Sequence, residues 1–489
     1  MVRMNKKVKF LKENGIYYTD SNLAQKMIKS LNINYKENFS IAELAVGEGH
    51  ILKYIVADYL KSNKDKEQSQ IVDFLENNIF AFDNRKEAIE ICKSELDKVV
   101  KKYLGESIVI KWNIKTIDIL NISKLKNNFN KFDYIISNPP FIARRNLDKR
   151  TVANLERYSK FCNKFNYNFY YYFMEIGFKL WNKCKKMVFI TPNSYIKSNS
   201  AKKMNEFFLT NHYFEKIIDF QNRLMFENAD TFTAISIFSP GNKFLTIVDS
   251  DNKIISKQNY NLIDKTNLNP FYNYKNTSKT KTINDIAKVR TGIATLQDHA
   301  FVVKEKEVKK IYQDYFLIQK NNSTYKIEKN IIKKGVRASN LDQKNYLIFP
   351  YTYVNKKLVL IKDLKNRFPL TFNYLTSVLP EKYQEKYGYG WGRTQGMSDY
   401  NASKIIVSRN ARLHDNPFYM VNEGFIISGI YIVPNNVAEI NELKKYLNSE
   451  SVQKLIDTLS KTYVKGYKSL SSTLLKNIPL NQSFFKIIG

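Results

Sequence analysis

IAELAVGEGH, residues 41–50, decides the fold class of this chain. Its first six residues are mostly apolar and predict a buried strand, and Gly47 and Gly49 then allow a sharp turn into a helix. A strand, a glycine-bearing turn and a helix form the first unit of an open α/β sheet, which binds ligands at the carboxyl ends of its strands. A purely structural turn explains the two glycines equally well, so the function depends on the flanking sequence.

Four more apolar runs read as strands, at residues 78–83, 133–138, 186–191 and 233–238, and residues 86–103 form an amphipathic, helical pattern. Strands that alternate with helices predict right-handed βαβ units and a parallel sheet. Pro240-Gly241 interrupts this pattern. Short β-like runs follow, and helical periodicity returns at residues 438–459. We therefore expect a Rossmann-like α/β domain at residues 1–240 and a mixed, β-rich domain at residues 241–489.

The charge of the chain indicates a polyanionic partner. Its 489 residues include 78 Lys and Arg but only 46 Asp and Glu, which gives a formal net charge of +32. Residues 1–240 contribute +13 and residues 241–489 contribute +19, so both predicted domains are basic. A bias of the whole composition towards lysine explains part of this excess. It does not explain why the acidic residues are so few, and nucleic acid is the partner that such a charge favours.

Composition also excludes several classes of protein. No apolar run approaches the ~20 residues that span a bilayer, and the first ten residues lack the apolar segment of a signal peptide. The three cysteines have no CxxC spacing, which argues against a disulfide framework and against a zinc site. We expect a cytoplasmic protein that has no metal ion and no membrane association.

Acidic residues follow two of the predicted strands. Asp83 ends one strand and can accept hydrogen bonds from ribose hydroxyls, and Asp118 ends another and can accept from an adenine amino group. Each could instead cap a helix. Together with the glycine turn they lie at the carboxyl edge of the predicted sheet. No GxxxxGK[ST] motif is present, and Glu43 and Glu48 beside the turn suit a cationic sulfonium better than a pyrophosphate.

Asn138-Pro139-Pro140-Phe141 directly follows the strand at residues 133–138. Two prolines fix the backbone and remove two donors, which leaves the Asn138 side-chain oxygen and the Pro139 carbonyl as acceptors on a rigid turn. Two such acceptors match the two hydrogens of an amino group, and Phe141 offers a face on which a base can stack. A strand-terminating turn is the alternative. The upstream glycine turn and Asp83 favour the catalytic interpretation.

Over about residues 10–240 this sequence resembles the γ-group amino-methyltransferases, which modify adenine N6 in DNA with S-adenosylmethionine. The resemblance implies that Asn138, Pro139, Pro140 and Phe141 form the catalytic motif and that Phe226 is the second aromatic around a flipped base. It implies that the cofactor contacts are Thr19, Glu43, Ala45, Gly47, Gly49, Asp83, Asp118 and Ile119. The chain departs from the family pattern at Leu44, where Pro is frequent, and at Phe141, where Tyr is frequent.

Other substrates remain open. RNA methyltransferases that modify guanine N2 or adenine N6, and protein glutamine-N5 methyltransferases, use the same type of turn. The basic second half favours DNA. A non-catalytic binding subunit is the third class, and the intact motif argues against it. Methylation of cytosine C5 requires a nucleophilic thiol, and no cysteine follows a proline as that chemistry would require.

The second half places Arg, Gln and Asn in loops, where they can bond base edges or phosphates. Residues 283–303 resemble the opening of target-recognition domains of the same family. Tyr, Gly and Trp in residues 383–393 could form a stacking loop or a packed surface loop. No nuclease motif is found. We therefore expect a monomer that acts on double-stranded DNA, with any restriction endonuclease on a separate chain.

Overall fold

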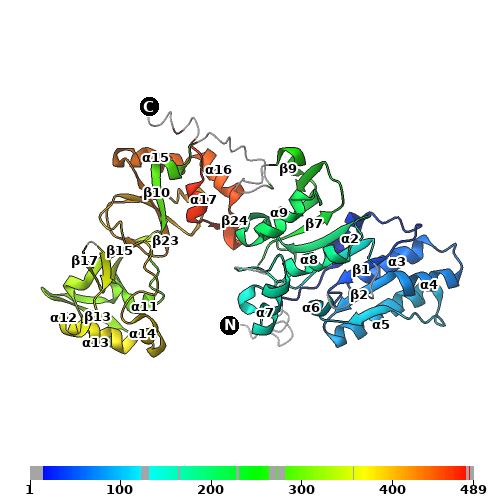
Figure 1. Ribbon diagram of the computed structural model, residues 1–489, viewed down its shortest axis with the longest axis horizontal. Helices are drawn as coiled ribbons and strands as arrows, with labels where there is room; N and C mark the ends of the chain where they lie inside the picture. Colours follow the sequence, from blue (N-terminus) through cyan, green and yellow to red (C-terminus); the bar gives the residue numbers. More distant parts are fainter. Residues whose placement is uncertain are drawn as a thin grey trace. The chain divides into compact units, whose positions relative to one another are not determined.

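The computed structural model describes residues 15–122, 131–162, 166–226, 231–263, 271, 281–355, 357–480 and 484. The chain forms two compact units, Met1–Lys275 and Asn276–Gly489 (Figure 1). No helix in these ranges is long and apolar enough to cross a membrane.

The first unit is built on a nine-stranded sheet with the order β3-β2-β1-β4-β5-β7-β6-β8-β9. The strands are β1 (Ile41–Leu44), β2 (Ile79–Asp83), β3 (Asn113–Thr116), β4 (Tyr134–Ser137), β5 (Met187–Pro192), β6 (Phe214–Asp219), β7 (Thr233–Phe238), β8 (Phe244–Val248) and β9 (Ile254–Asn259). Strands β1 to β5 pair in parallel, as predicted. The expectation of a parallel strand at residues 233–238 is wrong. β7 is antiparallel to both β5 and β6, because it pairs directly with β6, the strand before it in the chain.

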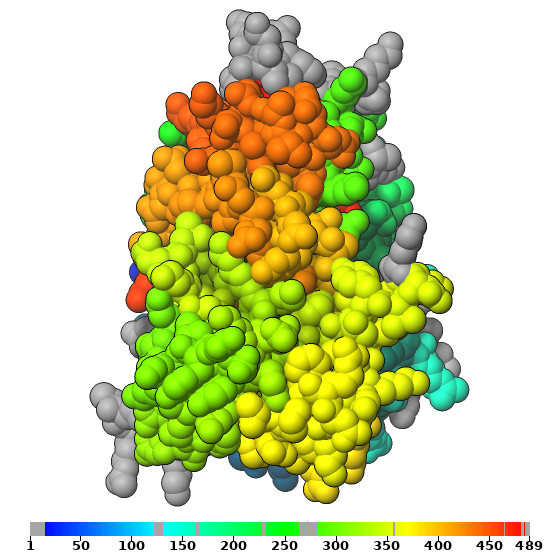
Figure 2. Space-filling model, turned by 90° about the vertical axis from the view of Figure 1, so that its left-hand side faces the viewer, coloured from blue at the N-terminus to red at the C-terminus, as the bar shows by residue number. Residues whose placement is uncertain are grey.

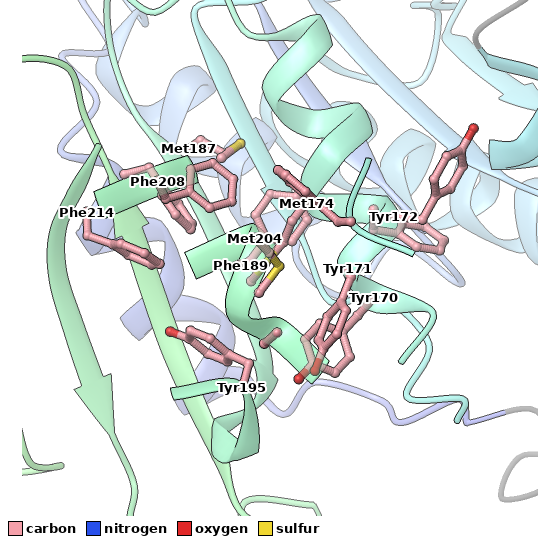
Figure 3. Packing of buried hydrophobic residues seen from close by; sticks show 14 of the residues in the cluster. Tyr170, Tyr171, Tyr172, Met174, Met187, Phe189, Tyr195, Met204, Phe208 and Phe214 are labelled. Atoms are coloured by element: carbon pink, nitrogen blue, oxygen red, sulfur yellow. The ribbon is translucent and has the colours of Figure 1, made fainter. Parts of the chain in front are cut away.

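Helices cover both faces of this sheet. They are α2 (Ser21–Leu31), α3 (Leu52–Ser62), α4 (Gln68–Asn78), α5 (Lys86–Leu104), α6 (Ile119–Ile122), α7 (Lys149–Tyr158), α8 (Tyr170–Leu180) and α9 (Lys202–Thr210). Successive residues of a strand face opposite sides, and β5 shows the result. Met187 and Phe189 belong to the core under α8 and α9, whereas Val188 and Ile190 belong to the core under α2 to α5. Figure 3 shows the first of these cores, with Phe189 packed among Met174 and Met204.

The sheet continues past Pro240-Gly241. β8 pairs in parallel with β6, and β9 pairs antiparallel with β8. The boundary expected near residue 240 is therefore too early. The β-like run at residues 244–248, which the sequence assigned to the second domain, forms β8 of the first sheet. The first unit extends to Lys275.

The second unit is rich in short strands, as the sequence predicts. Its strands are β10 (Ala287–Thr291), β11 (Val302–Lys304), β12 (Val308–Ile311), β13 (Tyr315–Lys320), β14 (Ser323–Glu328), β15 (Ile332–Arg337), β16 (Asn340–Ile348), β17 (Tyr351–Val354), β18 (Lys357–Leu360), β19 (Lys404–Ser408), β20 (Asn410–Ala411), β21 (Tyr419–Val421), β22 (Phe425–Ile426), β23 (Gly429–Pro434), β24 (Lys461–Thr462) and β25 (Lys468–Ser469). They form several small sheets, of which β10-β23-β19-β21 and β11-β16-β15-β22 are the largest.

The helices of the second unit are α10 (Ile283–Ile286), α11 (Asp298–Phe301), α12 (Leu364–Arg367), α13 (Pro369–Val378), α14 (Glu381–Tyr387), α15 (Ile440–Leu447), α16 (Glu450–Leu459) and α17 (Ser472–Lys476). Helices α15 and α16 confirm the periodicity at residues 438–459. On the face in Figure 2, the yellow segment that contains α12 to α14 lies beside the green strands of residues 300–330. Trp391 is a core residue, and its indole N–H donates to the Ile348 carbonyl, so this part of residues 383–393 is packed.

Candidate active site

The turn after β1 is built from backbone in the left-handed region. Ala45, Gly47 and Gly49 have φ values of 66°, 55° and 82°. The Val46 N–H donates to the Phe82 carbonyl at 2.9 Å, which holds the turn against the end of β2. A Cβ on Gly49 would lie 2.8 Å from Cys92 Sγ. The left-handed φ favours glycine at positions 47 and 49, and the close approach to Cys92 leaves room for glycine alone at position 49.

A cavity of about 360 Å³ opens at the carboxyl ends of β1, β2 and β4. Ten of the predicted site residues line it: Thr19, Glu43, Ala45, Gly47, Asp83, Asp118, Ile119, Asn138, Pro139 and Pro140. Gly49, Phe141 and Phe226 do not line it. The residues that line it but were not predicted include Tyr17, Tyr18, Arg85, Phe169 and Phe173. The fold thus brings the proposed cofactor and catalytic segments to one cavity.

Asp83 is buried and already accepts three hydrogen bonds. Its Oδ2 accepts from the Gly47 N–H at 2.9 Å, and its Oδ1 accepts from the Arg85 N–H at 3.0 Å and Nε at 3.1 Å. A carboxylate has about four acceptor sites, so this arrangement leaves about one for a ligand. Arg85 was not predicted. A ligand that donates two hydroxyl groups to Asp83 can bind only if the Arg85 side chain moves away from Asp83.

Glu43 lies in the floor of the cavity and is 1% exposed. Burial raises the pKa of its carboxyl well above the usual range, and the nearby Asp83 charge raises this pKa further. In the described part of the chain its Oε2 has no hydrogen-bond partner. A backbone hydrogen bond with Leu52 acts against this rise in pKa, so one of the two carboxyl oxygens is unpartnered. A buried acidic group with one unpartnered oxygen fits a cationic ligand, because a positive charge nearby favours the carboxylate form.

Asn138 is held in one orientation. Its Nδ2 donates to the Tyr17 carbonyl at 2.8 Å and to Thr19 Oγ1 at 3.0 Å. A carbonyl only accepts, so the amide nitrogen must face it and Oδ1 must face away. Oδ1 is buried, and no group of the described chain donates to it. The site therefore presents one fixed acceptor that lacks a donor.

The segment at residues 15–19 is also tied to the Asn-Pro-Pro-Phe turn by its backbone. The Phe141 N–H donates to the Gly15 carbonyl at 2.9 Å. Gly15 has a φ of 61°, and a Cβ there would lie 2.8 Å from the Phe141 nitrogen. Only glycine allows this approach. The Asn-Pro-Pro-Phe turn and the segment before α2 therefore form one rigid unit, joined at Gly15, Tyr17 and Thr19.

Three aromatic rings meet beside this turn. The Tyr17 centroid lies 5.2 Å from that of Phe141 and 5.6 Å from that of Phe226. Phe141 and Phe226 contact each other edge to face, with centroids 5.9 Å apart and an interplanar angle of 72°. Phe226 is 4% exposed. A base between two parallel rings needs roughly 7 Å between their planes, twice a van der Waals contact, so this conformation has no room for one.

Asp118 accepts a hydrogen bond from the Leu120 N–H at 2.9 Å and so caps the start of α6. Helix capping was the alternative to adenine binding that the sequence left open for Asp118. It also lines the cavity beside Ile119.

No group of His, Cys, Asp and Glu within the described residues could hold a metal ion. A nucleoside with a positive charge fits these residues, since Asp83 and Asp118 supply acceptors and Glu43 supplies an acidic group.

Residues 14–226 match the sequence model of the family described as Eco57I restriction-modification methylase. The chain is 23% identical over 379 residues to the type II restriction enzyme and methyltransferase RM.Eco57I of Escherichia coli, with 66% of this chain and 37% of that protein aligned. It is 22% identical over 387 residues to the type II methyltransferase M.HincII of Haemophilus influenzae, with 72% of this chain and 74% of that protein aligned. The aligned region thus spans little more than a third of RM.Eco57I.

Two solved structures share the fold over nearly the whole chain. The type IIL restriction-modification enzyme MmeI, in complex with DNA, has a TM-score of 0.64 and 12% identity, over 97% of this chain and 69% of that one. A nuclease-deletion mutant of the type ISP enzyme LlaGI, bound to a DNA substrate mimic, has a TM-score of 0.59 and 13% identity, over 97% and 46%. The chain therefore shares with these restriction-modification enzymes an α/β fold with an added β-rich unit, and its residues 14–226 are similar to the Eco57I restriction-modification methylases.

Proposed function

We propose that this chain is a site-specific DNA methyltransferase that transfers a methyl group from S-adenosylmethionine to adenine N6. The observation that carries the proposal is the buried Oδ1 of Asn138, which has no donor in the described chain, on a residue that lines the same cavity as Asp83 and Asp118. An unmet acceptor at a rigid turn is matched by an amino group.

The proposed cofactor contacts divide by chemistry. Asp83 would accept from the ribose hydroxyls once Arg85 yields, and Asp118 would accept from the adenine amino group, with Ile119 packed against the ring. Thr19, Ala45 and Gly47 would line the space for the methionine part, Gly49 would hold the turn that carries Gly47, and Glu43 would face the positive charge. When bound, S-adenosylmethionine supplies an electrophilic methyl group.

The chain's own residues position the nucleophile. Asn138 Oδ1 and the Pro139 carbonyl would each accept one hydrogen of the target amino group. This pairing draws the nitrogen lone pair out of conjugation with the ring and aims it at the methyl group. Pro139 and Pro140 restrict the backbone that carries both acceptors, so little reorganisation is needed when the reaction occurs. No covalent enzyme intermediate is required.

Adenine N6 lies inside a duplex, so the target base would have to be flipped out. Phe141 is the proposed stacking surface on the catalytic turn. Phe226 can serve as the second surface only if it moves away from Phe141, with which it is in direct contact. Tyr17 touches both rings and would define where the base enters.

In this proposal the enzyme acts as a monomer in the cytoplasm, the second unit selects the recognition sequence in double-stranded DNA, and a restriction endonuclease is a separate partner. Expression in a host that lacks DNA methylation, followed by sequencing of native DNA, tests the function. Methyladenine at a recurring motif supports it. Methylation of RNA guanine or adenine, or of a protein glutamine, with unmodified DNA would replace it with one of the other enzymes that use this turn.

A further inference from the structure

We propose that the segment directly after the catalytic turn, residues 143–160, is a phosphate-binding surface that holds the DNA backbone beside the target base. The inference rests on the proposed function and adds the surface on which that substrate docks. We define this surface, the α7 surface, by five exposed cationic side chains: Arg145, Lys149, Arg150, Arg157 and Lys160.

The spacing of these residues sets the basic face of α7. A helix turns 100° per residue, so Lys149, Arg150 and Arg157 lie within about 100° of one another around the axis. Leu155 lies about half a turn away from the middle of that arc, is fully buried and belongs to the core of the first unit. One side of α7 is thus anchored by an apolar residue, and the opposite side carries cations.

The helix is fixed at both ends. Asp148 accepts from the Thr151 N–H at 2.9 Å and caps the first turn. At the other end, the buried Glu175 of α8 accepts from Ser159 Oγ at 2.5 Å and from the Lys160 N–H at 3.0 Å. Arg144 pairs with Glu156 at 2.6 Å and so belongs to the scaffold. The exposed cations stand on a preorganised support, which lowers the entropic cost of binding.

The exposed cations lack acidic partners. Among the described residues none of the five forms an ion pair with a carboxylate, and Arg157 lies instead over the Tyr158 ring at 5.2 Å. On α5 three of the five lysines are paired within or near the helix, Lys93 with Glu90, Lys98 with Glu95 and Lys101 with Glu106. A surface helix normally balances its charge in this way. The excess on α7 indicates a ligand that supplies several negative charges.

The surface is also tied to the site. The Phe169 N–H donates to the Ile142 carbonyl at 2.8 Å, and the Arg144 N–H donates to the Tyr167 carbonyl at 3.0 Å. Arg145 is four residues from Phe141, so their Cα atoms are at most about 14 Å apart. α7 has ten residues and is roughly 15 Å long, which equals about four base steps along a duplex. These dimensions fit contacts to the phosphates next to a flipped base.

The test is a matched pair of charge variants of the full chain. One combines R145Q, K149Q, R150Q and R157Q. The control combines K61Q, K64Q, K101Q and K102Q, which are exposed and lie at or just after the carboxyl ends of α3 and α5. Those helices follow β1 and β2, so their carboxyl ends lie at the sheet edge opposite the cavity. Both variants lose four positive charges. Neither alters a residue that lines the cavity.

Binding to a short mixed-sequence DNA duplex is measured by fluorescence anisotropy over a range of NaCl concentrations, and S-adenosylhomocysteine binding is measured by calorimetry as a check on folding. For the α7 variant we expect a plot of log K against log [salt] that is shallower by about 2 to 4, since each lost phosphate contact removes about 0.9. The control should keep the native slope, and both variants should bind S-adenosylhomocysteine as the native protein does. If the quadruple α7 variant loses that binding, the pairs R145Q/K149Q and R150Q/R157Q replace it, each with an expected change of about 1 to 2.

An unchanged slope for the α7 variant, or an equal change in the control, would overturn the proposal. If the α7 variant lost affinity for an RNA duplex and kept its affinity for the DNA duplex, the surface would be assigned to RNA and the proposal would also be overturned. Methylation of DNA by the native protein distinguishes failure of the docking surface from failure of the proposed function. If the native protein methylates DNA and the α7 variant keeps the native salt dependence of DNA binding, only the docking surface is refuted. If the native protein does not methylate DNA, the proposed function is refuted.

Discussion

Replacing Asn138 with Ala removes the acceptor while leaving the rest of the cavity in place. The side chain makes two hydrogen bonds, both through Nδ2, to the Tyr17 carbonyl and to Thr19 Oγ1, and presents Oδ1 unpaired. Of the proposed cofactor contacts only Thr19 is among these partners, and its side chain is unchanged in the variant. The variant should therefore retain its cofactor affinity and lose its chemical step.

The size of the effect follows from what is lost. A preorganised polar group that pairs with the reacting atoms contributes on the order of 10² to 10³ in kcat, and Asn138 is one of two such groups. We expect kcat to fall at least about 100-fold. Loss of the two hydrogen bonds that Asn138 donates to the Tyr17 carbonyl and to Thr19 Oγ1 should also lower the free energy of unfolding by about 1 to 3 kcal/mol.

Thr19→Val supplies the graded control. It keeps the shape of the side chain, leaves Asn138 Oδ1 in place and removes one of the two bonds that orient Asn138. A neutral hydrogen bond contributes about 0.5 to 1.5 kcal/mol, so kcat should fall by at most about tenfold. Thr19→Ser restores the hydroxyl and should restore the rate.

Single-turnover transfer of tritiated methyl from S-adenosylmethionine to DNA gives the rates, and calorimetry with S-adenosylhomocysteine gives the cofactor affinity. An Asn138→Ala protein with intact binding and a rate within about tenfold of native would refute the acceptor role. A rate loss in Thr19→Val equal to that in Asn138→Ala would show that the hydroxyl itself acts in catalysis, against the orienting role.

Three further predictions concern the cofactor cavity and the domain boundary. Asp83→Ala should weaken S-adenosylhomocysteine binding by about 1 to 3 kcal/mol in calorimetry, because buried polar groups lose their partner, and an unchanged affinity would remove Asp83 from the cofactor site. The raised pKa of Glu43 means that the folded state binds more protons than the unfolded state above the usual carboxyl pKa, so this group lowers the free energy of unfolding as pH rises. Glu43→Gln should therefore gain stability relative to native between pH 5 and pH 8 in urea unfolding, and parallel pH profiles would contradict the shift. Residues 1–275 should bind S-adenosylhomocysteine without sequence-specific DNA binding, whereas residues 1–240 lose β8 and β9, expose the edge of β6 and should aggregate; equal solubility of the two fragments would contradict the revised boundary.

The sequence was sufficient to predict the elements whose pattern is local. The strand at residues 41–44, the turn at Gly47 and Gly49 and the helix at residues 86–104 each follow from a short run of residues. Chain order then places the ends of β1, β2 and β4 at one edge, so ten of the residues that line the cavity could be named. These predictions needed only periodicity and the parallel topology that it implies.

What could not be predicted depends on long-range partners. An apolar run does not reveal its direction in a sheet, and so β7 was wrongly expected to be parallel and β8 was assigned to the wrong unit. The contact of Phe141 with Phe226 joins segments 85 positions apart in the chain, and no local pattern gives the distance between their rings. The Arg85–Asp83 pair carried a local signal, a cation two residues after a carboxylate, which the sequence-based prediction did not use.

The most direct test of the central claim is nucleoside mass spectrometry of DNA incubated with the purified protein and deuterated-methyl S-adenosylmethionine. The account predicts labelled N6-methyladenine from the native protein, and none above background from Asn138→Ala at equal cofactor binding. Label in a different nucleoside, or equal labelling by the native and Asn138→Ala proteins, would contradict it.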